Sequence, residues 1–329
     1  MQSFEYAHPA SVKEAVALLG PHWTDAEILA GGTDLLSRMK DYVSAPKRVV
    51  SLQGLSDLQG ITAGTKETSI GATVTLTELA TNDSVRGTFP GVAQAAEGIA
   101  GPQTRNMATV GGNLCQRPCC WYFRAGYGLL ALDAHGKSLV PNGDNRYHAI
   151  LGNSGPAYFV SPSSLAPALM AVNATVHLAS PRGARAVPVA DFFITPRTSA
   201  EREHILAADE VLTRVTIPAA SRTLRTASTE IRERTAIDWA LVCASVALEM
   251  NGSTVRSARI VMGHVAPVPW RAPLAEQALA GHAVTEELAT KAGDAAVHGA
   301  KPLSGNAYKV QLARIAVKRA VLAAAQQGA

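Results

Sequence analysis

In the first 220 residues, short segments with the hydrophobic pattern of a strand alternate with short segments with the pattern of a helix. The capping-box pattern of Ser11 and Glu14 begins a helix that Gly20 ends. Apolar runs bounded by glycine, proline and polar residues predict short strands. The predicted elements are a helix over 11–20, a strand over 27–30, a helix ending at 40, a strand over 48–52, a hairpin over 60–72, helices from 75 and over 90–100, a helix over 163–172, and strands over 174–180 and ending at 217–218.

The last third of the chain has a different pattern. Asn251 and Gly252 lie between apolar runs over 239–250 and 255–265, which is the strongest hairpin signal in the sequence. Alanine-rich helical patterns follow over 273–280, 286–300 and 308–326. Strands followed by helices predict an α+β C-terminal domain that starts near residue 220.

Composition narrows the class of protein. Hydrophobic residues make up 47% of the chain and charged residues 17%, which is typical of a soluble globular protein. The net charge of +4 comes without a dense basic run, so nucleic-acid binding is not expected. The N-terminus has no secretory signal pattern, and the longest apolar run, 239–248, is shorter than the roughly 20 residues of a membrane span. We therefore expect no membrane span and a cytoplasmic location, with the periplasm reached only by export alongside a partner.

A Gly-Gly pair, Gly31-Gly32, follows the predicted strand over 27–30 and precedes the predicted helix that ends at residue 40. Glycines let backbone N–H groups approach a diphosphate without interference from a Cβ atom, and a helix start favours negative charge. The pair lacks the G-x-G-x-x-G spacing of a nicotinamide-binding Rossmann domain, and a tight strand–helix turn explains it equally well. The candidate diphosphate-binding residues of this first loop are Leu29, Ala30, Gly31, Gly32, Thr33, Asp34, Leu35 and Leu36.

A second Gly-Gly pair, 80 residues further along the chain, strengthens the interpretation. It too lies beside a hydroxyl residue, so a hydroxyl group and a second set of backbone amides can close over the other face of a diphosphate. Arg105 offers a further polar contact, although a surface role explains it as well. The candidate residues of this second loop are Thr109, Gly111, Gly112 and Asn113.

Five segments occur in an order that resembles one protein family. They are A-G-G-T-D-L-L, R-N-M-A-T-V-G-G-N, S-P-S-S-L-A-P-A-L, Asp191-Phe192-Phe193 and E-V-L-T-R-V-T-I-P. Their order, over nearly the whole chain, is similar to that of the flavin subunits of molybdenum hydroxylases. This family includes carbon monoxide dehydrogenase, xanthine dehydrogenase and bacterial aldehyde oxidoreductases.

The resemblance implies a fold of the α+β class. It would be the two-subdomain FAD-binding fold of the vanillyl-alcohol-oxidase type, followed by an α+β C-terminal domain of antiparallel sheet and helices. The expected parts are residues 1–58 as an N-terminal α/β FAD-binding subdomain, 59–219 as a second FAD-binding subdomain with an insertion over 114–161, and 220–329 as the C-terminal domain.

The resemblance also implies a function. The chain would be the FAD-binding electron-transfer subunit of a heterotrimer or its dimer, with molybdopterin on a large subunit and a [2Fe–2S] centre on a small one. Electrons would pass from iron–sulfur centres through FAD to an external acceptor, and the chain alone would have no hydroxylase activity. Both loops would hold the FAD pyrophosphate, and no residue is assigned a catalytic role. Ile99 and Leu212 would lie against the flavin, although core packing accounts for them equally well.

Two positions depart from the family pattern. The P-S-D-L segment common in the family has Ser164 in place of its carboxylate, so a cofactor hydroxyl would meet a neutral and weaker partner. Many relatives carry a lysine where this chain has Glu230. A carboxylate cannot support negative charge on a reduced flavin as lysine could, so we expect Glu230 to be a surface residue.

The insertion over 114–161 has little periodicity but holds seven of the 17 aromatic residues of the chain. That share is too high for a disordered linker, so we expect an ordered excursion. Its sequence resembles the insertion of 4-hydroxybenzoyl-CoA reductase and periplasmic aldehyde oxidoreductase flavin subunits, where it carries a [4Fe–4S] cluster.

Such a cluster normally needs four thiolates. The insertion offers only Cys115, Cys119 and Cys120, and two of these are adjacent, while the remaining Cys243 lies far away in an apolar stretch. His135 and His148 lie where relatives place further cysteines. We therefore expect the loop without the cluster, no other metal site, and Cys243 as a buried strand residue.

Two other classes of function remain open on sequence alone. A self-sufficient FAD-dependent oxidase or dehydrogenase of the related fold would need a substrate-binding cap, and the roughly 110 residues after Arg222 look too small for one. A scaffold or metal-binding module would use the aromatic insertion to contact a partner. The resemblance implies that the substrate of the complex is selected by the molybdenum subunit, which is a different chain.

Overall fold

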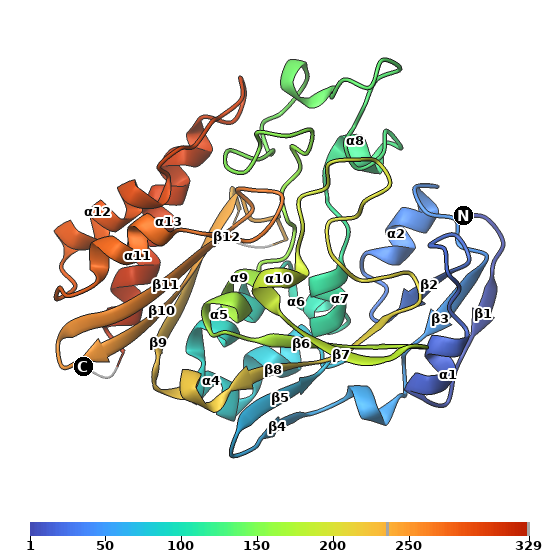
Figure 1. Cartoon of the computed structure of the whole chain (residues 1–329), viewed down its shortest axis with the longest axis horizontal. Coiled ribbons are helices and arrows are strands. Elements are labelled where there is room, and N and C mark those ends of the chain that lie inside the picture. Colours follow the sequence, from blue (N-terminus) through green and yellow to red (C-terminus); the bar gives the residue numbers. More distant parts are fainter. Residues whose placement is uncertain (235–236, 328–329) are drawn as a thin grey trace.

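Three β-sheets, formed one after another along the chain, organise the computed structural model, which describes residues 1–234 and 237–327 (Figure 1). The first sheet is parallel, with strand order β1-β3-β2. Ser11 caps its first helix by accepting a hydrogen bond from the Glu14 amide at 3.2 Å, as the capping-box pattern predicts. Its elements are β1 (Glu5–Ala7), α1 (Val12–Ala17), β2 (Ala26–Leu29), α2 (Leu35–Lys40) and β3 (Arg48–Ser51).

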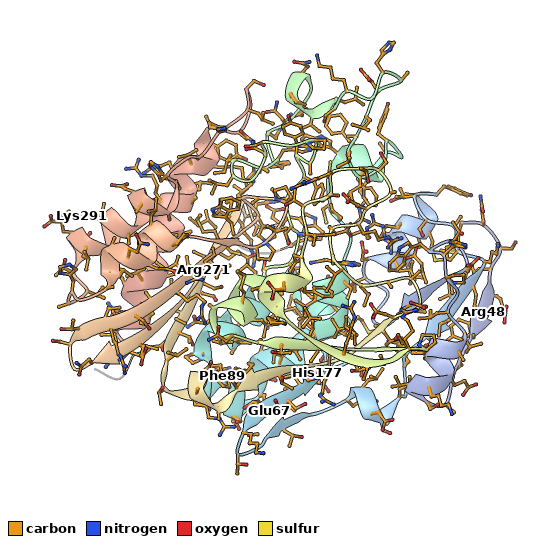
Figure 2. The ribbon with its side chains drawn as sticks, in the orientation of Figure 1. Arg48, Glu67, Phe89, His177, Arg271 and Lys291 are labelled. Atoms are coloured by element: carbon orange, nitrogen blue, oxygen red, sulfur yellow. The ribbon has the colours of Figure 1, made fainter. Side chains whose placement is uncertain are left out.

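An ion pair joins two neighbouring strands of this sheet. Arg48 on β3 pairs with Glu5 of the neighbouring β1 at 2.8 Å. Figure 2 shows Arg48 at one end of the molecule and Lys291, on the C-terminal helices, at the other. The inner side of the sheet packs through residues such as Val50 against Leu58 of the segment that leads to the second sheet.

The second sheet is antiparallel and has the order β4-β5-β8-β6-β7, so β8 returns between two strands that precede it in the chain. Its core lies between the sheet and a layer of short helices, and includes the fully buried Phe89, Leu165 and Phe192. The strands are β4 (Ile61–Ala63), β5 (Glu67–Gly71), β6 (Thr175–Ser180), β7 (Gly183–Pro188) and β8 (Val211–Pro218). The helices are α3 (Leu76–Thr81), α4 (Asp83–Thr88), α5 (Pro90–Gly98), α6 (Pro102–Arg105), α7 (Val110–Cys115), α9 (Leu165–Ala171) and α10 (Val189–Phe192), with a 3₁₀ turn at Ser56–Leu58.

The third sheet is antiparallel, with the order β12-β11-β10-β9, and has helices on both faces. Helices α11 and α13 pack on one face, while α5 and α9 of the preceding part pack on the other. Its elements are β9 (Arg225–Ile231), β10 (Val242–Asn251), β11 (Thr254–Gly263), β12 (Trp270–Arg271), α11 (Pro273–Leu279), α12 (Glu286–Ala296) and α13 (Tyr308–Ala325), preceded by a 3₁₀ turn at Ala219–Thr223. No helix in the described part of the chain is long and apolar enough to cross a membrane.

Most of the predicted elements are confirmed, including the β4–β5 hairpin and the β10–β11 hairpin that turns at Asn251 and Gly252. Three details differ. The helix predicted from residue 75 is two helices, because the Asn82 side chain caps a new one by accepting from the Val85 amide at 3.0 Å. The chain from Pro102 to Cys115 contains the short helices α6 and α7. Strands β1, β7, β9 and β12 were not predicted.

The insertion is ordered, as its aromatic content predicts. It contains α8 (Trp121–Arg124) and a 3₁₀ turn at Val140–Asn142. A small core of its own is formed by Phe123, Leu129, Leu130, Ala157 and Phe159. In Figure 1 the insertion is the green segment at the top, between α2 and the C-terminal helices.

A buried lysine joins the insertion to the C-terminal domain. Lys309, on α13, is 1% exposed. Its ammonium group donates to the carbonyl oxygens of Tyr147 at 3.1 Å, His148 at 3.2 Å and His264 at 2.6 Å. Burial lowers the pKa of Lys309 to about 7. These three bonds connect the insertion, the end of the third sheet and the last helix.

Candidate functional site

A cavity of about 520 Å³ lies where the N-terminal unit, the second sheet and the third sheet meet. Its volume is in the range of small-molecule and cofactor sites, about 300–1,000 Å³. The predicted site residues that line it are Ala30, Gly31, Gly32, Thr33, Asp34, Leu35, Ile99, Thr109, Gly111, Gly112, Asn113, Ser164 and Leu212. Leu29 and Leu36 differ from the prediction: Leu29 packs in the core against Leu35 and Met39, and Leu36 is 37% exposed outside the cavity wall.

The first Gly-Gly loop presents unpaired backbone amides to this cavity. It runs from the end of β2 to the start of α2. The N–H groups of Gly31, Gly32, Thr33 and Asp34 donate to no acceptor within the described residues. Gly32 has a φ of +73°, a conformation that glycine adopts readily and that favours this arrangement. Consecutive free amides form a concave site for an anion, so this loop fits a diphosphate.

The second Gly-Gly loop does not present a second set of amides, which corrects the prediction. The amides of Val110 and Gly111 donate to the carbonyls of Val74 and Ala72, at 2.9 and 2.8 Å. The amides of Gly112 and Asn113 are also occupied, because they donate to the side chain and carbonyl of Thr109 at 3.1 and 2.8 Å. What this loop can offer a ligand is therefore side chains.

Two side chains of the second loop retain donors. Thr109 accepts the Gly112 bond through its hydroxyl oxygen, so its hydroxyl proton is left for another acceptor. The carbonyl oxygen of the Asn113 side chain accepts from the Ser163 hydroxyl at 2.6 Å. The other end of the side-chain amide is therefore its NH₂ group, which can donate to a ligand. Both residues line the cavity.

The two loops touch through a glycine. A Cβ atom placed on Gly31 would lie 1.7 Å from the Met107 carbonyl oxygen, just before the second loop. A Cβ atom on Gly111 would lie 3.0 Å from Ala72. Gly31 is therefore required for the close approach of the two chain segments, and its role is more than that of a turn residue.

The side chain of Asp34 fixes the first loop against the insertion. Its carboxylate accepts from Arg38 at 3.0 Å, from Arg124 at 2.6 Å and from the Arg117 amide at 3.1 Å. Burial acts to raise the pKa of Asp34, but Arg38 and Arg124 outweigh it and the pKa lies below its ordinary value. Arg38 in turn is paired with the buried Glu27 at 2.7 Å. The backbone of Asp34, rather than its carboxylate, is the part that is free to contact a ligand.

A basic group on the cavity wall was not found from the sequence. Arg117 lies 2.5 Å from the buried Glu203, although the N–H is not aligned for a hydrogen bond. Arg202 stacks on the Trp23 ring at 3.5 Å, and burial lowers its pKa to about 9. His204, whose pKa burial lowers to about 4, completes the group. These residues come from distant segments without a common motif, so only the fold brings them together.

Ile99 and Leu212 contribute apolar surface to the cavity, and Leu212 also belongs to the core of the second sheet. Ile99 ends α5, and the next residue, Ala100, has a φ of +48°. Arg105 braces this turn by donating to the carbonyls of Ile99 and Ala100, both at 2.9 Å. Arg105 therefore supports the wall from within the chain, in place of the polar contact predicted for it.

Glu230 is a buried residue of the cavity wall, so its prediction as a surface residue is wrong. Its side chain is 14% exposed and accepts from the Ser164 hydroxyl at 2.8 Å. It also pairs with Arg232. The two positions that depart from the family pattern are thus in direct contact. This contact could not be predicted from the sequence, because residue 230 is brought to Ser164 by the pairing of β9 in the third sheet.

Two of the three cysteines of the insertion lie at the cavity as buried thiols. Cys115 and Cys119 line it, and burial raises the pKa of each thiol to about 12. The Cys120 sulfur lies 3.2 Å from Nε2 of His148. Cys243 is buried in β10, as predicted. Over residues 1–234 and 237–327, no three His, Cys, Asp or Glu side chains are grouped to hold a metal ion.

Comparison with known proteins covers both parts of the chain. A family described as "FAD binding domain in molybdopterin dehydrogenase" matches residues 2–220, and one described as "CO dehydrogenase flavoprotein C-terminal domain" matches residues 227–324. The carbon monoxide dehydrogenase medium chain of Hydrogenophaga pseudoflava is 32% identical over 325 residues, 98% of this chain and 96% of that protein. The aldehyde oxidoreductase FAD-binding subunit of Escherichia coli (strain K12) is 30% identical over 330 residues, 95% of this chain and 96% of that protein.

Solved structures are similar over the same span. Carbon monoxide dehydrogenase from Hydrogenophaga pseudoflava, in a form lacking the Mo-pyranopterin moiety, has a TM-score of 0.76 at 32% identity, covering 98% of this chain and 97% of that one. Quinoline 2-oxidoreductase from Pseudomonas putida 86 has a TM-score of 0.76 at 27% identity, covering 99% and 98%. The chain therefore belongs to the family of FAD-binding subunits of molybdopterin-dependent oxidoreductases.

Proposed function

We propose that the cavity holds FAD with its pyrophosphate on the free amides of the first loop, residues 31–34. These four consecutive amides are the observation that carries the proposal, because they match the anionic part of the cofactor. Thr109 and Asn113 donate to the pyrophosphate from the opposite side. Ile99, Ser164 and Leu212 lie on the part of the wall that receives the flavin ring.

The function that this arrangement supports is electron transfer. When bound, FAD supplies the redox chemistry, and the chain orients it and sets its surroundings. Relatives named as medium chains belong to enzymes of several subunits. We propose the same assembly here: a large subunit with molybdopterin, a small subunit with a [2Fe–2S] centre, and an external acceptor that takes electrons from the flavin. The cytoplasm is the compartment we propose.

We further propose that the insertion is retained without a [4Fe–4S] cluster. A cluster normally needs four thiolates, whereas the insertion offers only Cys115, Cys119 and Cys120, and two of these are adjacent in the chain. The test is an iron and acid-labile sulfide assay on the purified protein. We expect iron far below stoichiometric amounts, and about four irons per chain would refute the proposal.

FAD titration of the purified chain tests the main proposal. We expect a yellow protein that binds FAD reversibly. Co-expression with the proposed large and small subunits should yield a complex of three chains. The isolated chain should show no flavin reduction by aldehydes, purines or carbon monoxide. Substrate-dependent reduction by the chain alone would indicate a self-sufficient oxidase, and absence of FAD binding would leave a scaffold role.

A further inference from the structure

Glu230 lies in a hydrogen-bonded array that opens on the cavity. The Ser164 hydroxyl donates to Oε1 of Glu230 at 2.8 Å, and Nε2 of His264 lies 2.8 Å from the same hydroxyl. Arg232 pairs with the other carboxylate oxygen. The array therefore runs from a buried histidine to a carboxylate on the wall of the proposed flavin site.

The protons of this array can be assigned. Ser164 has one proton, and an ionised carboxylate can only accept, so that proton lies towards Glu230. His264 must then donate to Ser164 through its Nε2–H group. Burial lowers the pKa of His264 to about 3, so the ring is neutral and carries its proton on Nε2. His264 thus donates to the Ser164 hydroxyl, and Ser164 donates to the Glu230 carboxylate.

A second, water-sized cavity adjoins Glu230 on its other side. Its volume is about 20 Å³, which is room for one water molecule. The polar residues around it are Gln94, Ser164, Ser228, Thr229, Glu230 and Ser245, and the hydroxyls of Ser228 and Ser245 are 2.8 Å apart. Glu230 therefore lines both the large cavity and a small, largely polar space with room for a water molecule.

The charged and titratable groups around Glu230 come from several elements. Arg232 follows it on the chain, and Asp238 lies in the loop beyond. Cys243 of β10 faces it with a thiol whose pKa burial raises, and Lys309 of α13 lies behind His264. Burial raises the pKa of Glu230 above its ordinary value, although Arg232 and Ser164 act to lower it. Negative charge added to the adjoining cavity would raise the pKa of Glu230 further, because a like charge disfavours the ionised carboxylate.

We propose that Glu230 binds a proton when the flavin is reduced and releases it on reoxidation, with Ser164 and His264 as its positioning residues. This rests on the proposed FAD site. Reduction of a flavin by two electrons with uptake of one proton adds one negative charge to the cofactor. The Glu230 carboxylate takes a second proton from solvent, so the charge of the site stays constant. The electrons come from the iron–sulfur centre of the partner subunit, or from dithionite in the isolated chain.

Infrared difference spectroscopy of the FAD-loaded chain, before and after reduction by dithionite, tests the proposal directly. We expect a protonated-carboxyl band to appear on reduction, to shift in D₂O and to be lost in Glu230→Gln. The matched control is Glu249→Gln, on the neighbouring strand β10 and away from the cavity, which should keep the band. Potentiometry against pH should show that Glu230→Gln takes up one proton fewer per two electrons. Its midpoint potential then changes by about 30 mV less per pH unit.

The positioning residues supply a second test if Glu230→Gln fails to fold. Ser164→Ala removes the hydroxyl donor from the carboxyl, so the band should remain but shift in frequency. Wild-type protein that binds FAD and shows no carboxyl band on reduction would overturn this proposal and leave the proposed function standing. Wild-type protein that binds no FAD would overturn both.

Discussion

Substitution of Gly31 by alanine tests the contact between the two Gly-Gly loops. The added Cβ atom would lie 1.7 Å from the Met107 carbonyl oxygen, half of the 3.4 Å at which ordinary van der Waals contact begins. It would also lie 3.1 Å from the Ala108 Cα atom. All of these neighbours are backbone, so no side-chain rotation can make room. The loops must separate by more than an ångström.

The expected effect is on FAD affinity. A displacement of about 1 Å can cost roughly 100-fold where several groups must act together. The four amides of the first loop are such groups, so we expect the Kd of FAD to rise about 100-fold, or roughly 2.7 kcal/mol. The Kd is measured by quenching of FAD fluorescence on titration with the cofactor-free protein, and circular dichroism checks that the variant is folded.

The matched control is Gly87→Ala. A Cβ atom on this residue of α4 would have no neighbour within 4 Å. Alanine is favoured over glycine in helices by about 0.5–1 kcal/mol, so the control should melt slightly higher and bind FAD as the wild type does. A folded Gly31→Ala variant with a Kd within about threefold of the wild-type value would refute the reasoning.

Three further predictions concern the surroundings of the site. Because its arginine partners hold the Asp34 pKa below 3.8 despite burial, the stability that this charge contributes is complete above that pH and is lost as the pH falls through the folded-state pKa. Chemical denaturation should therefore show Asp34→Asn about 2 kcal/mol less stable at neutral pH, with the difference shrinking below pH 3.8; a constant difference would contradict this. Phe159→Ala should cost about 3 kcal/mol and expose the insertion first to limited proteolysis, and cleavage starting in the C-terminal helices would argue against a separate insertion core. Arg105→Ala should weaken FAD binding about tenfold by releasing the turn at Ile99, whereas an unchanged Kd would show that this turn does not shape the site.

The elements of the fold were predictable because their signals are local. Glycine, proline and capping residues mark where strands and helices begin and end, and Asn251-Gly252 specifies its hairpin within four residues. The order of strands was not predictable. The return of β8 between β5 and β6 depends on its pairing with β5, which lies more than 100 residues earlier in the chain, as well as on its pairing with the nearer β6.

The same distinction applies to the site. The two Gly-Gly pairs could be identified from the sequence because only glycine lets the backbone come close to a diphosphate or to another chain segment. The pairing of the Val110 and Gly111 amides depends on the turn that follows β5 at residues 72–74, and this turn leaves no trace beside the two amides in the sequence. Glu230 was misjudged for a related reason. A single charged residue in a polar run gives no indication that sheet pairing carries it into the interior, where Ser164 meets it.

The buried ammonium of Lys309 has a consequence for engineering this chain. Deletion of residues 114–161 would be the obvious way to build a minimal version. Such a truncation removes the carbonyls of Tyr147 and His148 and leaves the cation with one acceptor in an apolar interior. A minimal version would need an uncharged residue such as methionine at position 309. The insertion therefore stabilises the contact between the end of the third sheet and the last helix, whether or not it carries iron.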